Sequence, residues 1–231
     1  MLNESLDKEL AKLKEEVTIM GRLLADQVFK SVKALVDKDI ELAKEVIAKD
    51  DMVDKMEMDL ERKALGLIAL KQPMASDLRL IGTVLRMIVD IERMADHAED
   101  IATIAIELYE DKYIKPLIDI PRMSKLAQDM IEKALLAFIE EDVDRVNELI
   151  PLEIEMDNLY DQTFRELLSY MLQDQKNIPQ ATQLLLVAGH LERLGDHATN
   201  LGECVIYTVK GERLDLNAIA REQKQSSNNI L

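Results

Sequence analysis

The sequence predicts an all-α protein built from two tandem, similar three-helix bundles whose helices run up and down. Three observations lead to this prediction: the composition, the spacing of apolar residues, and a repeat at an offset of 100 residues. The commonest residues, Leu, Ala, Glu, Lys, Met and Ile, are largely good helix formers. Aromatic residues, which favour strands, make up only 3% of the chain, and only 7 glycines and 5 prolines are present to break helices.

Apolar residues at three- and four-residue spacing predict three long helices in the first bundle, residues 1–115. These helices cover about residues 10–39, 40–70 and 78–112. Pro73 cannot occupy a helix interior, so we expect the segment KQPMASD to separate the second helix from the third. Ser76 in this segment is a natural N-cap for the third helix, because its hydroxyl can accept a backbone N–H.

The second bundle, residues 119–212, follows a predicted linker, YIKPLIDIPR, which contains two prolines. Its helices cover about residues 123–141, 143–172 and 178–210. Ser124 is expected to cap the first of them, Pro151 to bend or interrupt the second, and Gly211 to end the third. The remaining residues, 213–231, are polar and weakly periodic, and they predict a frayed or loose tail.

The chain is strongly acidic, with 29 basic against 45 acidic residues and a formal net charge of −16. A field of this sign repels phosphate backbones and anionic lipid, so it argues against nucleic-acid binding and favours cations or basic protein surfaces. The single cysteine, Cys204, excludes an intrachain disulfide and suits a reducing compartment. The N-terminal residues do not resemble a secretory signal, and the apolar runs are far shorter than the ~20 residues that span a bilayer. We therefore expect a soluble cytoplasmic protein without membrane insertion.

Two nearly identical acidic heptapeptides stand 100 residues apart, ERMADHA from Glu92 and ERLGDHA from Glu192. Residues four positions apart project from the same face of a helix, so Glu92 pairs with Asp96 and Glu192 with Asp196. Both glutamates fall on the apolar stripe that should face the core. Because an unpaired buried carboxylate is strongly destabilising, these positions indicate a partner or a bound cation.

A second acidic pair is predicted on the neighbouring helix of each bundle, Glu57 with Glu61 and Asp157 with Asp161. In each bundle the two pairs lie at equal distances from the turn between their helices, so antiparallel packing brings four carboxylates together. Hard oxygen ligands select Mg²⁺, Mn²⁺, Ca²⁺ or iron over thiolate-binding metals. Isolated acidic pairs are usually solvated surface charges, but four pairs in matched register favour metal sites.

Four further residues could extend these sites. His97 and His197 directly follow the motif aspartates, and they are candidates either for metal binding or for a hydrogen bond that supports the structure. Asp100 and Asn200 lie one helical turn beyond the aspartates and could add oxygen ligands.

Over about residues 5–211 the chain resembles the PhoU family, phosphate-responsive negative regulators that accompany high-affinity phosphate transport. The resemblance rests on QPMASDLRLIGTVLRMIVDIERMADHAEDIA in the first half and LLLVAGHLERLGDHATNLGE in the second. It implies two PhoU-like three-helix bundles with multinuclear metal clusters on E(D)xxxD motifs, iron foremost, with zinc, manganese or magnesium in other members. These motifs fall on Glu57 with Glu61, Glu92 with Asp96, Asp157 with Asp161, and Glu192 with Asp196. Glu61 departs from the aspartate that usually ends the motif.

The resemblance also implies partners and a role. Members of the family signal phosphate sufficiency to a membrane sensor histidine kinase and restrain the phosphate ABC transporter through its cytoplasmic ATPase. We therefore expect a non-enzymatic regulator of phosphate uptake and of phosphate-starvation signalling. Homodimer formation, and direct phosphate binding to a metal with an open coordination position, are left open.

Two alternatives stand beside this interpretation: a carboxylate-bridged, ferritin-like di-metal oxidoreductase, and a purely structural helical adaptor. The oxidoreductases use Glu-x-x-His motifs, whereas the histidines here stand five residues after Glu92 and Glu192. A structural adaptor would contain negligible metal.

Overall fold

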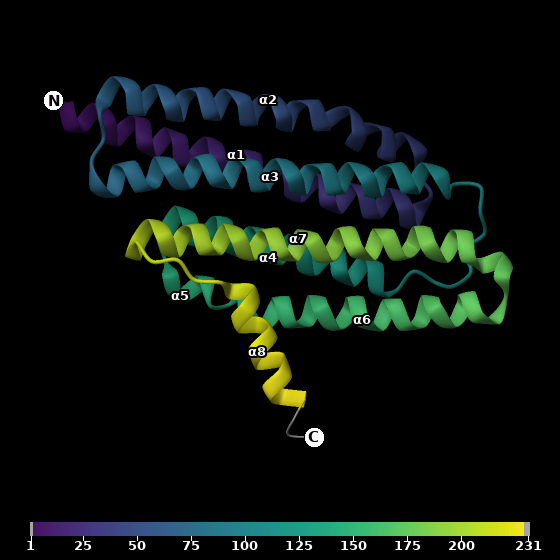
Figure 1. Cartoon of the computed structure of the whole chain (residues 1–231). Helices are drawn as coiled ribbons and strands as arrows, with labels where there is room; N and C mark the ends of the chain where they lie inside the picture. Colours follow the sequence, from purple (N-terminus) through teal and green to yellow (C-terminus); the bar gives the residue numbers. More distant parts are fainter. Residues whose placement is uncertain (1, 229–231) are drawn as a thin grey trace.

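The computed structural model describes residues 2–228, which form α-helices and one short 3₁₀-helix and contain no β-strand. Met1 and residues 229–231, which belong to the predicted first bundle and tail, lie outside the described residues. The first bundle consists of α1 (Leu2–Asp37), α2 (Ile40–Lys71) and α3 (Ala75–Glu107). The second consists of α4 (Asp119–Glu140), α6 (Leu149–Gln173) and α7 (Ile178–Lys210). The predicted all-α class and the two tandem bundles are confirmed (Figure 1).

Three shorter elements complete the chain: α5 (Val143–Val146), the 3₁₀-helix η1 (Gln175–Asn177) and α8 (Leu216–Asn228). The two bundles pack along their length, with α3 against α7 and α1 against α4 (Figure 1). Their buried side chains form a single apolar core that continues from one bundle into the other. No described helix is long and apolar enough to cross a membrane.

The linker between the bundles is held by a side chain of the second bundle. Gln180, which is 7% exposed, accepts the backbone N–H of Ile114 at 2.7 Å and donates to the carbonyl of Lys112 at 3.2 Å. Backbone groups that leave a helix need such partners when they are covered. The linker is therefore fixed against the start of α7.

Several helix boundaries differ from the sequence prediction. The third helix begins at Ala75, and Met74 occupies its N-cap without a side-chain hydrogen bond, so the predicted cap Ser76 lies inside the helix. The same helix ends at Glu107 rather than near Lys112. α4 begins at Asp119, so the second predicted cap, Ser124, is buried within it and donates to the carbonyl of Val28 on α1 at 3.4 Å. At the start of α4, the contact of Ser124 with α1 accompanies the earlier start of the helix.

The predicted second helix of the second bundle is interrupted before Pro151 rather than at it. α5 ends at Val146, and α6 begins at Leu149, which places Pro151 in the first turn, where its missing N–H has no partner to lose. Gly211 ends α7 as expected: its φ is 74°, and its N–H bonds the carbonyl of Tyr207.

The C-terminal residues differ most from the prediction. Instead of a loose tail, α8 is a helix that packs on α6 and α7, with Leu216 and Ala220 buried in the core. These two residues lie four positions apart on one face of this short, polar helix, and the partly buried Ile219 packs against the core beside them.

Candidate metal centres

Six carboxylates form what we call the first acidic face, where α2 lies against α3. They are Asp50, Asp54 and Glu57 on α2 and Glu92, Asp96 and Glu99 on α3. Burial raises the pKa of Glu92, and the nearby charges of Asp96 and Glu57 raise it further. Burial, then Glu61 and Asp54, likewise raise the pKa of Glu57. The antiparallel helices thus bring the carboxylates of both motifs close enough to repel one another electrostatically.

Asp50 is the carboxylate of the first acidic face that has a buried oxygen without a hydrogen-bond partner. Its Oδ1 atom is buried and has no hydrogen-bond partner among the described residues. Burial raises the pKa of Asp50 to about 7, and Glu99 and Asp54 add to the shift. Asp50, Asp96 and Glu99 offer oxygens that lie within 4.8 Å of one another. The sequence prediction missed Asp50, although Asp50 and Asp54 form another acidic pair at four-residue spacing directly before Glu57.

The second acidic face lies where α6 meets α7. It comprises Glu153, Asp157 and Asp161 on α6 and Glu192 and Asp196 on α7. Burial raises the pKa of Glu192, followed by the charges of Asp196 and Asp157. Burial also raises the pKa of Asp196. The two helices again bring their acidic motifs together.

Glu153 is the buried member of the second acidic face. The residue is 4% exposed, and its Oε2 atom has no hydrogen-bond partner among the described residues. Burial raises the pKa of Glu153 to about 8, with Asp196 and Asp157 adding to the shift. A Cβ at Gly195 would lie 3.1 Å from this oxygen, so the glycine of ERLGDHA leaves room for the carboxylate. The sequence prediction missed Glu153, which stands one helical turn before Asp157.

Both acidic faces fit a bound divalent cation. Each gathers carboxylates from two helices, and each contains one buried carboxylate oxygen that no described group satisfies. Such atoms are rare in folded proteins, because a buried polar atom loses its hydrogen bonds to water and gains no other hydrogen bond in exchange. A cation would pair with these oxygens and reverse the mutual repulsion, and an all-carboxylate set suits Mg²⁺, Mn²⁺, Ca²⁺ or iron.

The second acidic face is partly neutralised by the chain itself. Lys224 of α8 places its Nζ atom 3.2 Å from carboxylate oxygens of both Asp157 and Asp161. Asn217 of α8 donates to Oδ1 of Asp196 at 2.9 Å. The positive charge of Arg221 also lowers the pKa of Asp196. The two acidic faces are therefore not equivalent, since the described residues of α8 contact carboxylates of the second face and none of the first.

The predicted ligands differ in their surroundings. Those that are half-buried within the two faces are Glu57, Glu92, Asp157, Glu192 and Asp196. Glu61, Asp96 and Asp161 are exposed at the rims. The four predicted additional ligands, His97, Asp100, His197 and Asn200, lie instead along the seam between α3 and α7.

The seam holds all three histidines of the chain. Nδ1 of His197 lies 2.9 Å from Oδ1 of the buried Asp90. Nδ1 of His190 lies 3.3 Å from Nδ1 of His97 and 3.6 Å from Oδ2 of Asp100. Neither His190 nor Asp90 was predicted as a site residue, although both stand two positions before the glutamate of their heptapeptide.

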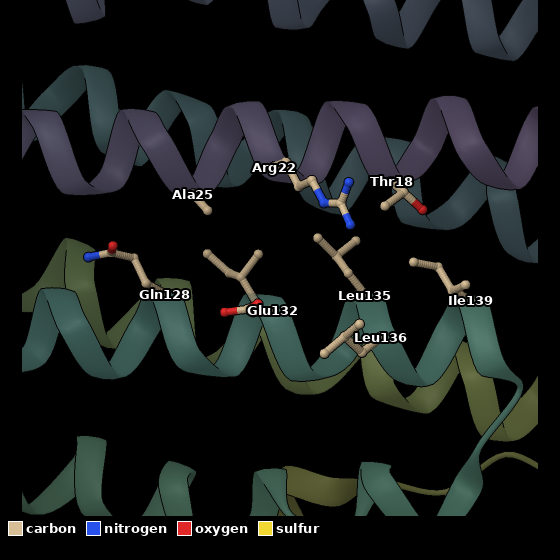
Figure 2. A pocket seen from close by; sticks show the side chains of 9 residues that line it. Thr18, Arg22, Ala25, Gln128, Glu132, Leu135, Leu136 and Ile139 are labelled. Carbon is tan, nitrogen blue, oxygen red and sulfur yellow. The ribbon is translucent and has the colours of Figure 1, made fainter.

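A separate hollow of about 310 Å³ opens between α1 and α4 (Figure 2). Figure 2 shows Leu135 and Ile139 of α4 beside Arg22 and Thr18 of α1. None of the predicted ligands lines this hollow, whose walls combine aliphatic side chains with Thr18, Arg22, Gln128 and Glu132. It offers no cluster of ligand atoms comparable to the acidic faces.

A duplicated three-helix bundle with one acidic face on each repeat is the class of protein that the fold and these sites define. Comparison with models of protein families finds the PhoU domain in residues 17–105 and 120–205. The chain belongs to the PhoU family.

Similar proteins and structures support this assignment over nearly the whole chain. The phosphate-specific transport system accessory protein PhoU homolog of Aquifex aeolicus is 42% identical, covering 90% of this chain and 94% of its own length. The homolog of Clostridium acetobutylicum is 36% identical, covering 94% of this chain and all of its own length (100%). The crystal structure of PhoU from Pseudomonas aeruginosa superposes with a TM-score of 0.85 at 34% identity, covering 89% of this chain and 99% of that one.

Proposed function

We propose that the protein is a metal-binding, non-enzymatic regulator that restrains phosphate uptake and phosphate-starvation signalling. Membership of the PhoU family supports the physiological role, since its relatives are named as accessory proteins of the phosphate-specific transport system. The unpartnered carboxylate oxygens of Asp50 and Glu153, one on each acidic face, support metal binding, and this part of the proposal depends on them.

The metal ions would be held by carboxylates of both helices of each acidic face. On the first face these are Asp50, Glu57, Glu92 and Glu99, with Asp96 and the adjoining Glu61 exposed at the rim. On the second face they are Glu153, Asp157, Glu192 and Asp196, with Asp161 exposed at the rim. Bound cations supply the positive charge that keeps such carboxylates ionised, and they would tie α2 to α3 and α6 to α7. Clusters of iron are the first expectation, with zinc, manganese or magnesium as the alternatives.

The proposed partners are the ATPase of the phosphate ABC transporter and the sensor histidine kinase of the phosphate response. A chain with a net charge of −16 suits basic surfaces on such partners. The same charge opposes direct binding of phosphate unless a metal with an open coordination position receives the anion. Calorimetric titration of the metal-loaded protein with inorganic phosphate tests that route, and an absence of heat at physiological concentrations excludes it.

The arrangement of the histidines supports a non-enzymatic role. Ferritin-like oxidases place a histidine three residues after a ligand glutamate, within the same metal site. In this chain all three histidines face the seam between α3 and α7, where they contact one another, Asp90 or Asp100. Peroxide turnover by the iron-loaded protein would favour the oxidoreductase instead.

Metal binding is tested by elemental analysis of protein purified without a metal-affinity tag. The wild type should contain metal, and the double variant Glu92→Gln/Glu192→Gln should lose most of it while remaining helical by circular dichroism. The matched control, Glu110→Gln/Glu212→Gln, removes the same charge from exposed positions just beyond the ends of α3 and α7 and should retain the metal. A metal-free wild type, or a double variant that keeps its metal, contradicts the proposal.

The regulatory role is tested in the organism by deleting the gene. We expect a phosphate-starvation reporter to become active at high phosphate, and the wild-type gene to silence it again. The variant Glu92→Gln/Glu192→Gln should restore silencing poorly if the metal is required. A reporter that stays silent in the deletion strain contradicts the regulatory role.

A further inference from the structure

We propose that His97, His190 and Asp100 form a mononuclear site for a divalent transition metal, with Zn²⁺ as the best fit, that joins the two bundles. The site lies at the seam and shares no ligand with the two acidic faces, although Asp100 adjoins Asp96 and Glu99 of the first. His97 and Asp100 are on α3 of the first bundle, whereas His190 is on α7 of the second. The metal would therefore connect the two repeats rather than stabilise one of them.

The distances between the donor atoms of the three side chains are compatible with tetrahedral coordination. Zn²⁺ binds imidazole nitrogen at 2.0–2.1 Å, so two nitrogen ligands in a tetrahedral site stand about 3.3–3.4 Å apart. The Nδ1 atoms of His97 and His190 are 3.3 Å apart, and Nδ1 of His190 is 3.6 Å from Oδ2 of Asp100. One ligand atom from each of the three residues lies within 4.8 Å of the others. Small side-chain adjustments would complete the site, with a fourth position left for water.

The three side chains differ in their exposure. The side chain of His190 is 14% exposed and that of Asp100 is 58% exposed, while His97 is half-buried. The proposed site would therefore open to solvent beside Asp100, where a metal would enter and where a water would take the fourth position.

The donor set selects a metal different from those of the acidic faces. Two imidazole nitrogens and one carboxylate oxygen are ligands of Zn²⁺ and of other late first-row metals, whereas carboxylate-only sites favour hard cations. Asp96 and Glu99, which neighbour Asp100, add negative charge near the seam, and Arg193 partly offsets it. The inference does not depend on metal binding by the acidic faces.

A direct hydrogen bond between two neutral imidazoles gives a similar distance, so the experiment must separate the two arrangements. Co²⁺ is a suitable probe for the complete chain, purified without a metal-affinity tag and stripped with a chelator. Tetrahedral Co²⁺ with nitrogen ligands absorbs visible light far more strongly than six-coordinate Co²⁺ on carboxylates. We expect an intense visible band whose final amplitude corresponds to one tetrahedral Co²⁺ ion per protein chain. Added Zn²⁺ should abolish this band.

Variants identify the ligands. His190→Gln should abolish the band, and Asp100→Asn, at an exposed position, should weaken Co²⁺ binding at least tenfold without affecting the fold. His197→Gln is the matched control, because this histidine pairs with Asp90 on the same seam and should leave the band intact. Circular dichroism of each variant establishes that loss of the band is not loss of structure.

The outcomes separate this inference from the proposed function. The acidic-face variant Glu92→Gln/Glu192→Gln should retain the band even after it has lost the metal of its faces. An absent band in the wild type, or a band unchanged by both His190→Gln and Asp100→Asn, overturns the inference. A band lost in the acidic-face variant overturns it as well, because the absorbing metal would then sit on the carboxylates.

Discussion

His197 on α7 places its Nδ1 atom 2.9 Å from Oδ1 of Asp90 on α3, and the same contact occurs a second time with the repeats exchanged. The residues 100 positions away are His97 and His190, whose Nδ1 atoms are 3.3 Å apart. Position 90 therefore meets position 197, and position 190 meets position 97. Reciprocal contacts of this kind are the property of an isologous interface, here between two halves of one chain.

The exchange of one residue makes the two contacts chemically different. Asp90 in the first repeat corresponds to His190 in the second, so one contact pairs a carboxylate with an imidazole and the other pairs two imidazoles. Asn200 also approaches the Asp90 carboxylate, at 3.5 Å. The carboxylate contact is satisfied by the protein alone, whereas the imidazole contact can accept a cation. We expect the two contacts to respond differently to mutation and to metal.

The first prediction concerns the Asp90–His197 contact. His197→Ala should lower the free energy of unfolding by about 1–3 kcal/mol, because it removes the principal partner of a buried carboxylate. The double variant Asp90→Asn/His197→Ala should be less destabilised than the sum of the two single variants, since the charge that needs the partner is gone. Urea unfolding of the four proteins at pH 7 measures this coupling, and strict additivity would show that the two side chains do not interact.

The second prediction is a pH dependence caused by Glu153. Its pKa is raised from 4.5 to about 8 in the folded protein. Between these values the native state keeps a proton that the unfolded state releases, so the stability contributed by this group is complete below pH 4.5 and is lost as the pH rises through 8. In the presence of a chelator, Glu153→Gln should therefore be more stable than the wild type at pH 8.5, and the difference should shrink at pH 5. The urea unfolding midpoints of both proteins at the two pH values test this prediction. The same pH dependence of stability in both proteins would contradict it.

The sequence predicts the repeat and the acidic motifs well, because both depend on periodicity. The spacing of apolar residues fixes helix faces, and the offset of 100 residues places Glu57 near Glu92 and Asp157 near Asp196 once the helices run antiparallel. Asp50 and Glu153 were missed because their importance comes from burial against the opposite helix, which helical spacing alone does not reveal.

The errors at helix ends have a similar cause. Ser124 is a good capping residue in isolation, but α4 begins one turn earlier, and Ser124 packs against α1. The tail was misjudged because α8 has only a narrow apolar face, and its contacts with the acidic residues of α6 join positions more than 60 apart (Lys224 with Asp161, 63 apart). Such contacts leave no periodic signal in the sequence.

The third prediction concerns Lys224, whose Nζ atom lies where a cation on the second acidic face would compete with it. Lys224→Ala should increase the affinity of the second face for Mn²⁺ a few-fold, since partly exposed ion pairs of this kind contribute about 0–1 kcal/mol. The control is Lys210→Ala, an exposed lysine at the end of α7. Calorimetric titration of the full chain compares the variants. An unchanged or lower affinity in Lys224→Ala would show that α8 does not compete with metal.

The fourth prediction is that removing metal destabilises the wild type. A ligand that binds only the folded state at 100 times its dissociation constant adds about 2.7 kcal/mol to stability, so stripping the metal should lower the melting temperature clearly. The variant Glu92→Gln/Glu192→Gln should show a much smaller fall in melting temperature on chelation than the wild type, because its acidic-face metal is already lost and only metal at the seam remains to be removed. Differential scanning calorimetry at pH 7, with elemental analysis of each sample, provides the measurement. If verified removal of metal leaves the wild-type melting temperature unchanged, the carboxylates of the two faces do not bind cations strongly enough to hold α2 to α3 or α6 to α7, and the acidic faces act only as solvated surfaces.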